Sequence, residues 1–120
     1  HSRDGLDEIS IGDKTEVAEL KDGMVRRFSI QPEDFGIKRS SIDAIKAADA
    51  ADSLRIIRSV LDNQPGPARN IVQLNAGAAI YTGGLAKTLA EGVTLADAAI
   101  ASGEARNRLD RLVILTQGFE

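Results

Sequence analysis

The sequence predicts an α/β fold in which one β-hairpin is followed by four or five helices. Three observations predict it. The 120 residues suffice for one domain or a part of one, but not for two independent cores. A Lys21-Asp22-Gly23 turn joins two short segments in which apolar and polar residues alternate. From Ser41 onward, the spacing of the apolar residues changes from two to about 3.6 residues.

The hairpin is expected at about 14–30, after a polar loop at 1–13. Asp-Gly favours the tight turn of a hairpin because both residues tolerate a positive φ. Pro32 and Gly36 then interrupt the second strand, since proline cannot donate to a strand ladder. A two-stranded hairpin is only marginally stable by itself. We therefore expect it to border a larger sheet whose other strands lie upstream, outside these residues.

The helical remainder is expected at about 41–116. Ser40 or Ser41 can cap a short first helix, and a second helix at about 50–63 ends at Pro65-Gly66-Pro67. The apolar residues of this second helix share one face, which we expect to point inward: Leu54, Ile57 and Leu61.

The third helix carries no charged residue between Asn70 and Ala86, and its apolar residues surround nearly the whole circumference. Such a helix is buried or spans a membrane, and this one is shorter than the roughly 20 apolar residues that a span needs. We therefore expect it to be buried, with its small residues allowing close approach of its neighbours. Its expected inner face continues to Leu85, and Gly83-Gly84 marks its end.

Two further helices complete the prediction. Thr94 is expected to cap a helix at 95–102, with Asp97 as a capping partner, and Gly103 ends it. The last helix, at 104–116, is expected to turn four apolar residues inward: Leu109, Leu112, Val113 and Leu115.

The composition argues against several kinds of site. A formal net charge of −3 and an aromatic content of 3% argue against a nucleic-acid-binding protein, which needs a basic surface and stacking side chains. The absence of cysteine excludes disulfides and thiolate metal sites. His1 is the single histidine, so no site can use two histidines of one chain. The residues contain no apolar signal segment, and no membrane is expected.

The densest group of polar residues is Asp4-Gly5-Leu6-Asp7-Glu8. Adjacent carboxylates repel each other unless a cation lies between them. Mg²⁺ suits such a pair, because it is usually bound through one or two carboxylates together with water and substrate phosphates. Asp7 and Glu8 are therefore candidate metal ligands. A solvated acidic turn, with Asp4-Gly5 forming the turn, is the alternative and is the commoner meaning of so short a motif.

The run from Asp4 to Ser10 resembles the acidic loop of the anthranilate phosphoribosyltransferases, and several other blocks agree with that family in the same order. The residues that carry the further resemblance are 15–23, 32–36, Leu74-Asn75-Ala76 with Tyr81, and 94–115, which include 99–103. The resemblance covers nearly the whole chain. One departure is Ser2, because the family often has glycine after the histidine that corresponds to His1, which we expect to be a strand-end residue.

The resemblance implies that residues 1–120 form the C-terminal portion of the α/β catalytic domain of the nucleoside phosphorylase and phosphoribosyltransferase fold. The acidic metal loop would then occupy residues 4–10. The family's N-terminal helical domain and its glycine-rich phosphate loop are expected outside this chain. No residue here is assigned to catalysis or substrate binding, and the isolated chain is expected to be inactive.

The resemblance also implies an activity: transfer of the phosphoribosyl group of phosphoribosyl pyrophosphate to anthranilate, with release of pyrophosphate, in tryptophan biosynthesis. Asp7 and Glu8 match the family's pair that binds Mg²⁺, and Asp4 either supports that pair or forms the turn. A cytoplasmic homodimer joined through the absent helical domain is expected.

Two alternatives remain open. One is a pyrimidine nucleoside phosphorylase of the same superfamily, although the adjacent carboxylates argue against it because its reaction releases no pyrophosphate. The other is a non-catalytic relative that binds nucleic acid, against which the net charge counts.

Overall fold

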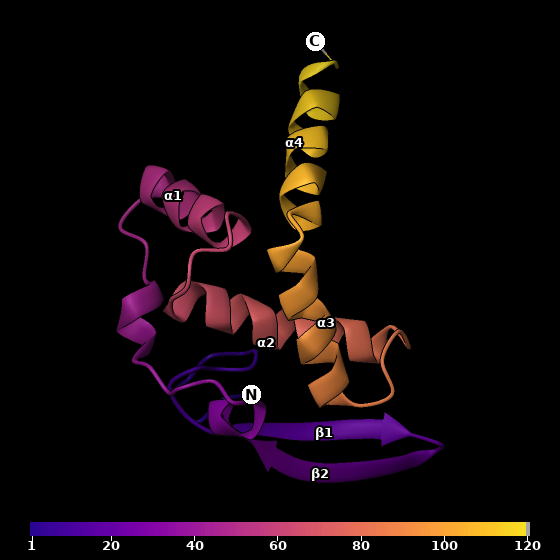
Figure 1. Ribbon diagram of the computed structural model, residues 1–120. Coiled ribbons are helices and arrows are strands. Elements are labelled where there is room, and N and C mark those ends of the chain that lie inside the picture. The colour runs from indigo at the N-terminus through magenta and orange to yellow at the C-terminus, as the bar shows by residue number, and fades with distance from the viewer. Residues whose placement is uncertain (120) are drawn as a thin grey trace. The chain divides into compact units, whose positions relative to one another are not determined.

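The computed structural model describes residues 1–119, which form two compact units (Figure 1). The first unit is His1–Lys46 and contains the hairpin. The second unit begins at Ala47 and contains the four α-helices. This order of elements is the α/β arrangement that the sequence predicts, with a hairpin before the helices.

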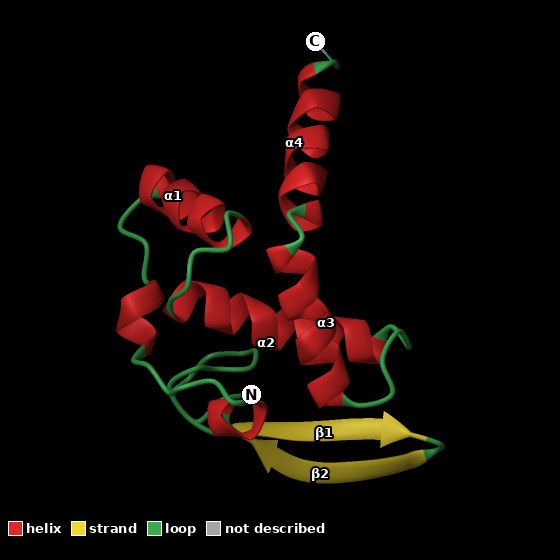
Figure 2. Ribbon diagram, in the orientation of Figure 1, coloured by secondary structure: helices red, strands yellow, loops and turns green. Residues whose placement is uncertain are grey.

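The hairpin consists of β1, Thr15–Lys21, and β2, Met24–Ile30 (Figure 2). The strands are antiparallel, and their register runs from the pair Thr15 and Ile30 to the pair Lys21 and Met24. Asp22 has a φ of 52° and Gly23 a φ of 75°, so both turn residues are left-handed. This is the backbone of a type I′ turn, and it confirms the hairpin and its turn.

A short stretch at His1 to Arg3 runs antiparallel to β1 on the side away from β2. Ser2 bridges Thr15, the Glu16 amide donates to the His1 carbonyl at 2.9 Å, and the Arg3 amide donates to the Lys14 carbonyl at 2.9 Å. The place of His1 in this pairing agrees with its expected position at a strand end.

Two single-turn 3₁₀-helices follow β2. The first is η1, Pro32–Phe35, which ends at Gly36 with a φ of 71°. The second is η2, Ile42–Ile45, whose N-cap Ser41 accepts a hydrogen bond from the Asp43 amide. The short helix expected near Ser41 is therefore present as a 3₁₀-helix. The buried apolar residues of this unit are Ile11, Ile30, Pro32 and Ile37.

The second unit contains α1, Ala50–Leu61; α2, Pro67–Thr82; α3, Leu89–Ala101; and α4, Glu104–Gln117. Its core lies where α2 and α3 cross, as Figure 1 shows. Gly77 of α2 and Gly92 of α3 are both buried at that crossing. The core side chains around them are Leu74, Val93, Ala96 and Ile100.

The start of α3 differs from the prediction. The N-cap is Thr88, whose hydroxyl oxygen accepts a hydrogen bond from the Glu91 amide at 3.1 Å, while the Glu91 carboxylate accepts from the Lys87 amide at 2.7 Å. Thr94 lies inside the helix, and its hydroxyl donates to the Ala90 carbonyl. The prediction that Thr94 begins the helix was wrong, because Thr88 caps a helix that already begins at Leu89. Gly92 lies within this helix, where the lack of a side chain permits close packing against α2.

Several apolar helix faces that the periodicity predicted to be buried are exposed within residues 1–119. Leu54 and Ile57 of α1 are each more than 40% exposed, and Val60 is the buried residue of that helix. Leu85 lies beyond the end of α2 and is 76% exposed, while α2 buries only Leu74 and Gly77. Three of the residues expected on the inner face of α4 are likewise exposed: Leu112, Val113 and Leu115. Periodicity identifies the apolar face of a helix, but it does not show which part of the protein packs against that face.

None of the helices within residues 1–119 is long and apolar enough to cross a membrane.

Candidate functional site

The acidic loop is closed at its base by backbone hydrogen bonds. The Ser2 amide donates to the Leu6 carbonyl at 2.8 Å, and the Gly5 amide donates to the Ser2 carbonyl at 3.2 Å. Gly5 has a φ of 96°, which a residue with a side chain rarely adopts. Asp4-Gly5 therefore forms the turn, and Asp7 and Glu8 follow it in the chain.

Asp7 and Glu8 are both exposed at the outer part of this loop. Neither carboxylate takes part in a salt bridge with another residue of the described range. Within residues 1–119, no group of three or more His, Asp or Glu side chains gathers into a metal cage. Two exposed carboxylates with no protein counter-charge suit Mg²⁺, which completes its shell with water and substrate phosphates, and they do not suit a closed all-protein site.

Asp4 has different surroundings from Asp7 and Glu8, because it is partly buried and hydrogen-bonded. One carboxylate oxygen accepts a hydrogen bond from the Ser10 hydroxyl, and the other accepts from the Leu6 amide at 3.4 Å. Burial opposes ionisation of this carboxyl, but the hydrogen bonds, with that of Ser10 the strongest, outweigh it and hold the pKa of Asp4 below its usual value. The structure thus confirms that Asp4 forms the turn, which is one of the two roles predicted for it.

Ser10 connects Asp4 to the start of β1. Its hydroxyl oxygen accepts from the Gly12 amide at 2.8 Å, and its own amide donates to the Thr15 hydroxyl oxygen at 3.2 Å. Ser10 is fully buried and Thr15 is nearly so. Nothing in the sequence pointed to this connection, since serine and threonine in a polar loop give no signal of burial.

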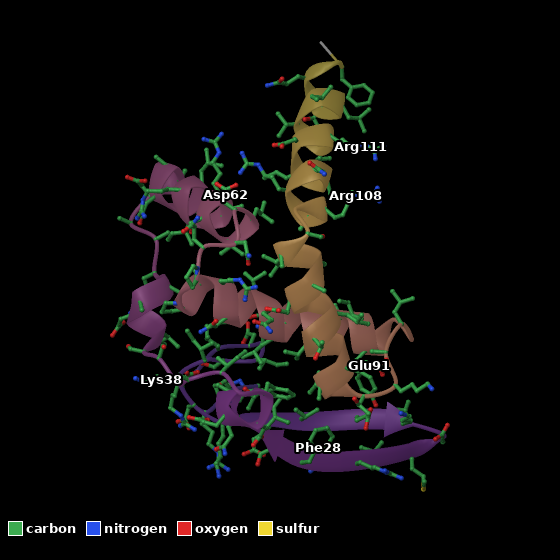
Figure 3. The ribbon with its side chains drawn as sticks, viewed as in Figure 1. Phe28, Lys38, Asp62, Glu91, Arg108 and Arg111 are labelled. Carbon is green, nitrogen blue, oxygen red and sulfur yellow. The ribbon has the colours of Figure 1, made fainter. Side chains whose placement is uncertain are left out.

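Arg39, which follows the hairpin, is engaged with two carboxylates. Arg39 donates to Glu33 at 3.0 Å and to Asp13 at 3.5 Å. The hydrogen bond from Arg39 lowers the pKa of Glu33, and the bond to Glu33 raises the pKa of Arg39. Lys38 lies beside Arg39 in sequence and is exposed (Figure 3). Arg39 therefore serves to hold the loops of this unit together.

The second unit contains a polar cluster that the sequence did not reveal. Arg69 of α2 is 14% exposed, and its guanidinium donates to Asn63 at 2.8 Å, to Gln73 at 3.1 Å and to Asp97 of α3 at 2.8 Å. Asp97 is thus an ion-pair partner across two helices, and its predicted capping role was wrong. Arg69 and Gln73 are four residues apart on one helix, which is the only signal of this cluster in the sequence.

The sequence of this chain is similar both to a family profile and to individual known proteins. The profile of the family described as "Glycosyl transferase family, a/b domain" matches residues 1–106. The chain is 51% identical over 117 residues to the anthranilate phosphoribosyltransferase of Polynucleobacter necessarius, covering 98% of this chain and 34% of that protein. It is 56% identical over 116 residues to the enzyme of the same name from Thioalkalivibrio sulfidiphilus, covering 97% of this chain and 34% of that protein.

A solved structure also resembles this chain. The crystal structure of anthranilate phosphoribosyltransferase from Thermus thermophilus superposes with a TM-score of 0.79 at 34% identity, covering 92% of this chain and 32% of that one. The chain therefore spans about a third of the length of the relatives it matches.

Proposed function

Because the chain belongs to the glycosyl transferase family that carries this a/b domain, we propose that the intact protein transfers the phosphoribosyl group of phosphoribosyl pyrophosphate to anthranilate. In this reaction the bond between the ribose C1 and the pyrophosphate oxygen breaks, a bond between C1 and the amino nitrogen of anthranilate forms, and that nitrogen releases a proton. Identity above 50% to relatives of that name, over nearly all of these residues, carries the proposal. The activity is assigned to a polypeptide about three times as long as this chain.

Within that protein, we assign Asp7 and Glu8 to Mg²⁺. Their exposure and their lack of a basic partner among the described residues support this assignment. When bound, Mg²⁺ neutralises the charge that develops on the departing pyrophosphate. The two carboxylates contribute by holding the positive charge of the cation at a fixed place on the loop. The exposed loop leaves the remaining coordination positions to water and to substrate oxygens.

The remaining features of the proposal concern the whole protein. We propose that it acts in tryptophan biosynthesis in the cytoplasm, and that it is a homodimer joined through a helical domain outside these residues. Neither nucleic acid nor a membrane has a part in this proposal. The isolated 120-residue chain is expected to be inactive, because the family's phosphate loop lies outside it.

A substrate comparison with the full-length protein tests the proposal. With Mg²⁺, anthranilate and phosphoribosyl pyrophosphate, we expect anthranilate to be consumed and pyrophosphate released in equal amounts. With thymidine and inorganic phosphate, we expect no release of thymine. The reverse pattern would assign a nucleoside phosphorylase. Inactivity with both substrate pairs, together with salt-sensitive retention on DNA, would assign a nucleic-acid-binding relative.

A further inference from the structure

We infer that four residues at the base of the acidic loop form a positioning network that presents Asp7 and Glu8 together to the metal. The loop-base network consists of Asp4, Ser10, Gly12 and Thr15. This inference rests on the proposed role of Asp7 and Glu8. It gives the supporting role expected of Asp4 a structural basis and assigns a role in it to Ser10, Gly12 and Thr15.

The network ties the two ends of the loop to each other and to the hairpin. Asp4, before the metal pair, accepts a hydrogen bond from the hydroxyl of Ser10, after the metal pair. The Ser10 amide donates to the Thr15 hydroxyl oxygen at 3.2 Å, and Thr15 is the first residue of β1. The span that carries Asp7 and Glu8 is thereby anchored on both sides to a strand whose register is fixed.

Gly12 completes the network by leaving room for it. Its amide donates to the Ser10 hydroxyl oxygen at 2.8 Å. A Cβ atom at this position would lie 2.6 Å from the Asp4 carboxylate, 3.1 Å from the Ile42 side chain and 3.4 Å from the Ser40 carbonyl oxygen. Asp4 can therefore reach Ser10 only because position 12 has no side chain.

The same contacts indicate that Asp4 holds the loop and is not itself a third metal ligand. Both of its carboxylate oxygens accept hydrogen bonds from the loop itself, one from Leu6 and one from Ser10. Ser10 is fully buried, so its hydroxyl directs the Asp4 carboxylate toward the interior of the unit. Asp7 and Glu8 are exposed by contrast. The geometry divides the three acidic residues into one that holds the loop and two that face solvent.

Two variants of the full-length protein test the network independently. Asp4→Asn replaces one acceptor oxygen by an amide nitrogen, so the side chain can no longer accept from both Leu6 and Ser10. Ser10→Ala removes the hydroxyl that joins Asp4 to Gly12. The matched control is Asp13→Asn, which makes the same chemical change nearby, at a half-exposed carboxylate outside the network.

Two measurements read the result: Mn²⁺ binding followed by electron paramagnetic resonance in the presence of phosphoribosyl pyrophosphate, and hydrogen exchange of the amides of Leu6 and Gly12. We expect both network variants to weaken Mn²⁺ binding about tenfold or more, as loss of a supporting partner does in metal sites. Exchange at Leu6 and Gly12 should become faster in both variants. Turnover at saturating Mg²⁺ should stay within about threefold of the wild type, because the ligands themselves are intact.

Comparison with Asp7→Asn combined with Glu8→Gln separates the two roles. This variant should lose Mn²⁺ binding while exchange at Leu6 and Gly12 stays unchanged. Wild-type Mn²⁺ affinity in folded Asp4→Asn and Ser10→Ala proteins, even with a lowered melting temperature, would overturn the inference and leave only a structural role. Absence of transfer to anthranilate, with the binding and exchange results as expected, would count against the proposed function alone.

Discussion

Gly92 of α3 lies against the backbone of Gly77 of α2: a Cβ atom at Gly92 would come within 2.3 Å of the Gly77 carbonyl oxygen. A Cβ at Gly77 would likewise lie 2.6 Å from the Cα and the amide nitrogen of Val93. Backbone atoms cannot rotate away as a side chain can. The two helices therefore cross at a distance that only glycine permits at either position.

Gly92→Ala and Gly77→Ala should each destabilise the protein. Alanine in a helix is favoured over glycine by about 1 kcal/mol, whereas overpacking typically costs about 1–3 kcal/mol. Since the clash is with backbone, we expect the upper part of that range and a net loss in urea denaturation. Gly118→Ala is the control, because its Cβ would have ordinary contacts at 3.5 and 3.8 Å. Two alanine variants as stable as that control would show that the helices are not so close.

Arg69→Met should also destabilise the second unit. The change removes an ion pair to Asp97 and hydrogen bonds to Asn63 and Gln73, and a mostly buried charged hydrogen bond contributes about 1–3 kcal/mol. Arg69→Lys should restore only part of this, because an ammonium group lacks the fork that reaches three partners. Arg108→Met is the control, since Arg108 on α4 is exposed (Figure 3). Equal denaturation midpoints for the Met variants at positions 69 and 108 would contradict the role of the cluster.

Thr88→Ala should cost about 0.5–2 kcal/mol, the usual loss on removing an N-cap. Thr94→Ala should cost much less, because the Thr94 hydroxyl only donates to a carbonyl inside the helix. The free energies of unfolding of the two variants compare the observed start of α3 with the start that the sequence suggested. A larger loss at Thr94 than at Thr88 would favour the later start.

The stabilisation contributed by Asp4 should depend on pH. Its folded-state pKa is lowered from 3.8, so its ionised form is favoured by folding. The contribution is therefore complete at neutral pH and is lost as the pH falls below about 4 through the folded-state pKa. The difference in unfolding free energy between wild type and Asp4→Asn should be constant from about pH 7 to 5 and should shrink in more acidic solution. A difference in unfolding free energy that grows on acidification would mean that folding raises the pKa of Asp4, contrary to this account.

The sequence predicted the hairpin most accurately because local chemistry determines it. The turn requires a positive φ at Asp22 and Gly23, which both residues tolerate. This turn joins the paired residues Lys21 and Met24 directly and thereby fixes the register of the strands. Gly103 between the last two helices was predicted for the same reason, and its φ is 78°. Asp7 and Glu8 were selected as candidate ligands from their adjacency, and their exposure agrees with that choice without testing it.

The parts that sequence reasoning missed depend on contacts between distant residues. Arg69 meets Asp97 across 28 positions, and Ser10 becomes buried only because the loop folds back onto β1. Gly92 lies inside α3 and carries no sequence signal that the backbone of α2 packs against it. The apolar face of α4 was predicted to be covered, but Leu115 of that face is 61% exposed within the described residues. A single sequence identifies such a face without identifying its partner.

We propose that Asp7 and Glu8 hold the metal used in phosphoribosyl transfer to anthranilate. The most direct test is the turnover number of the full-length protein carrying Asp7→Asn and Glu8→Gln, measured at saturating Mg²⁺ and both substrates. The matched control is Glu33→Gln with Asp34→Asn, the other adjacent acidic pair of the same unit. We expect turnover to fall by a factor of about 100 or more in the first variant and to stay close to wild type in the control. Wild-type turnover with Asp7 and Glu8 both neutralised would contradict the claim.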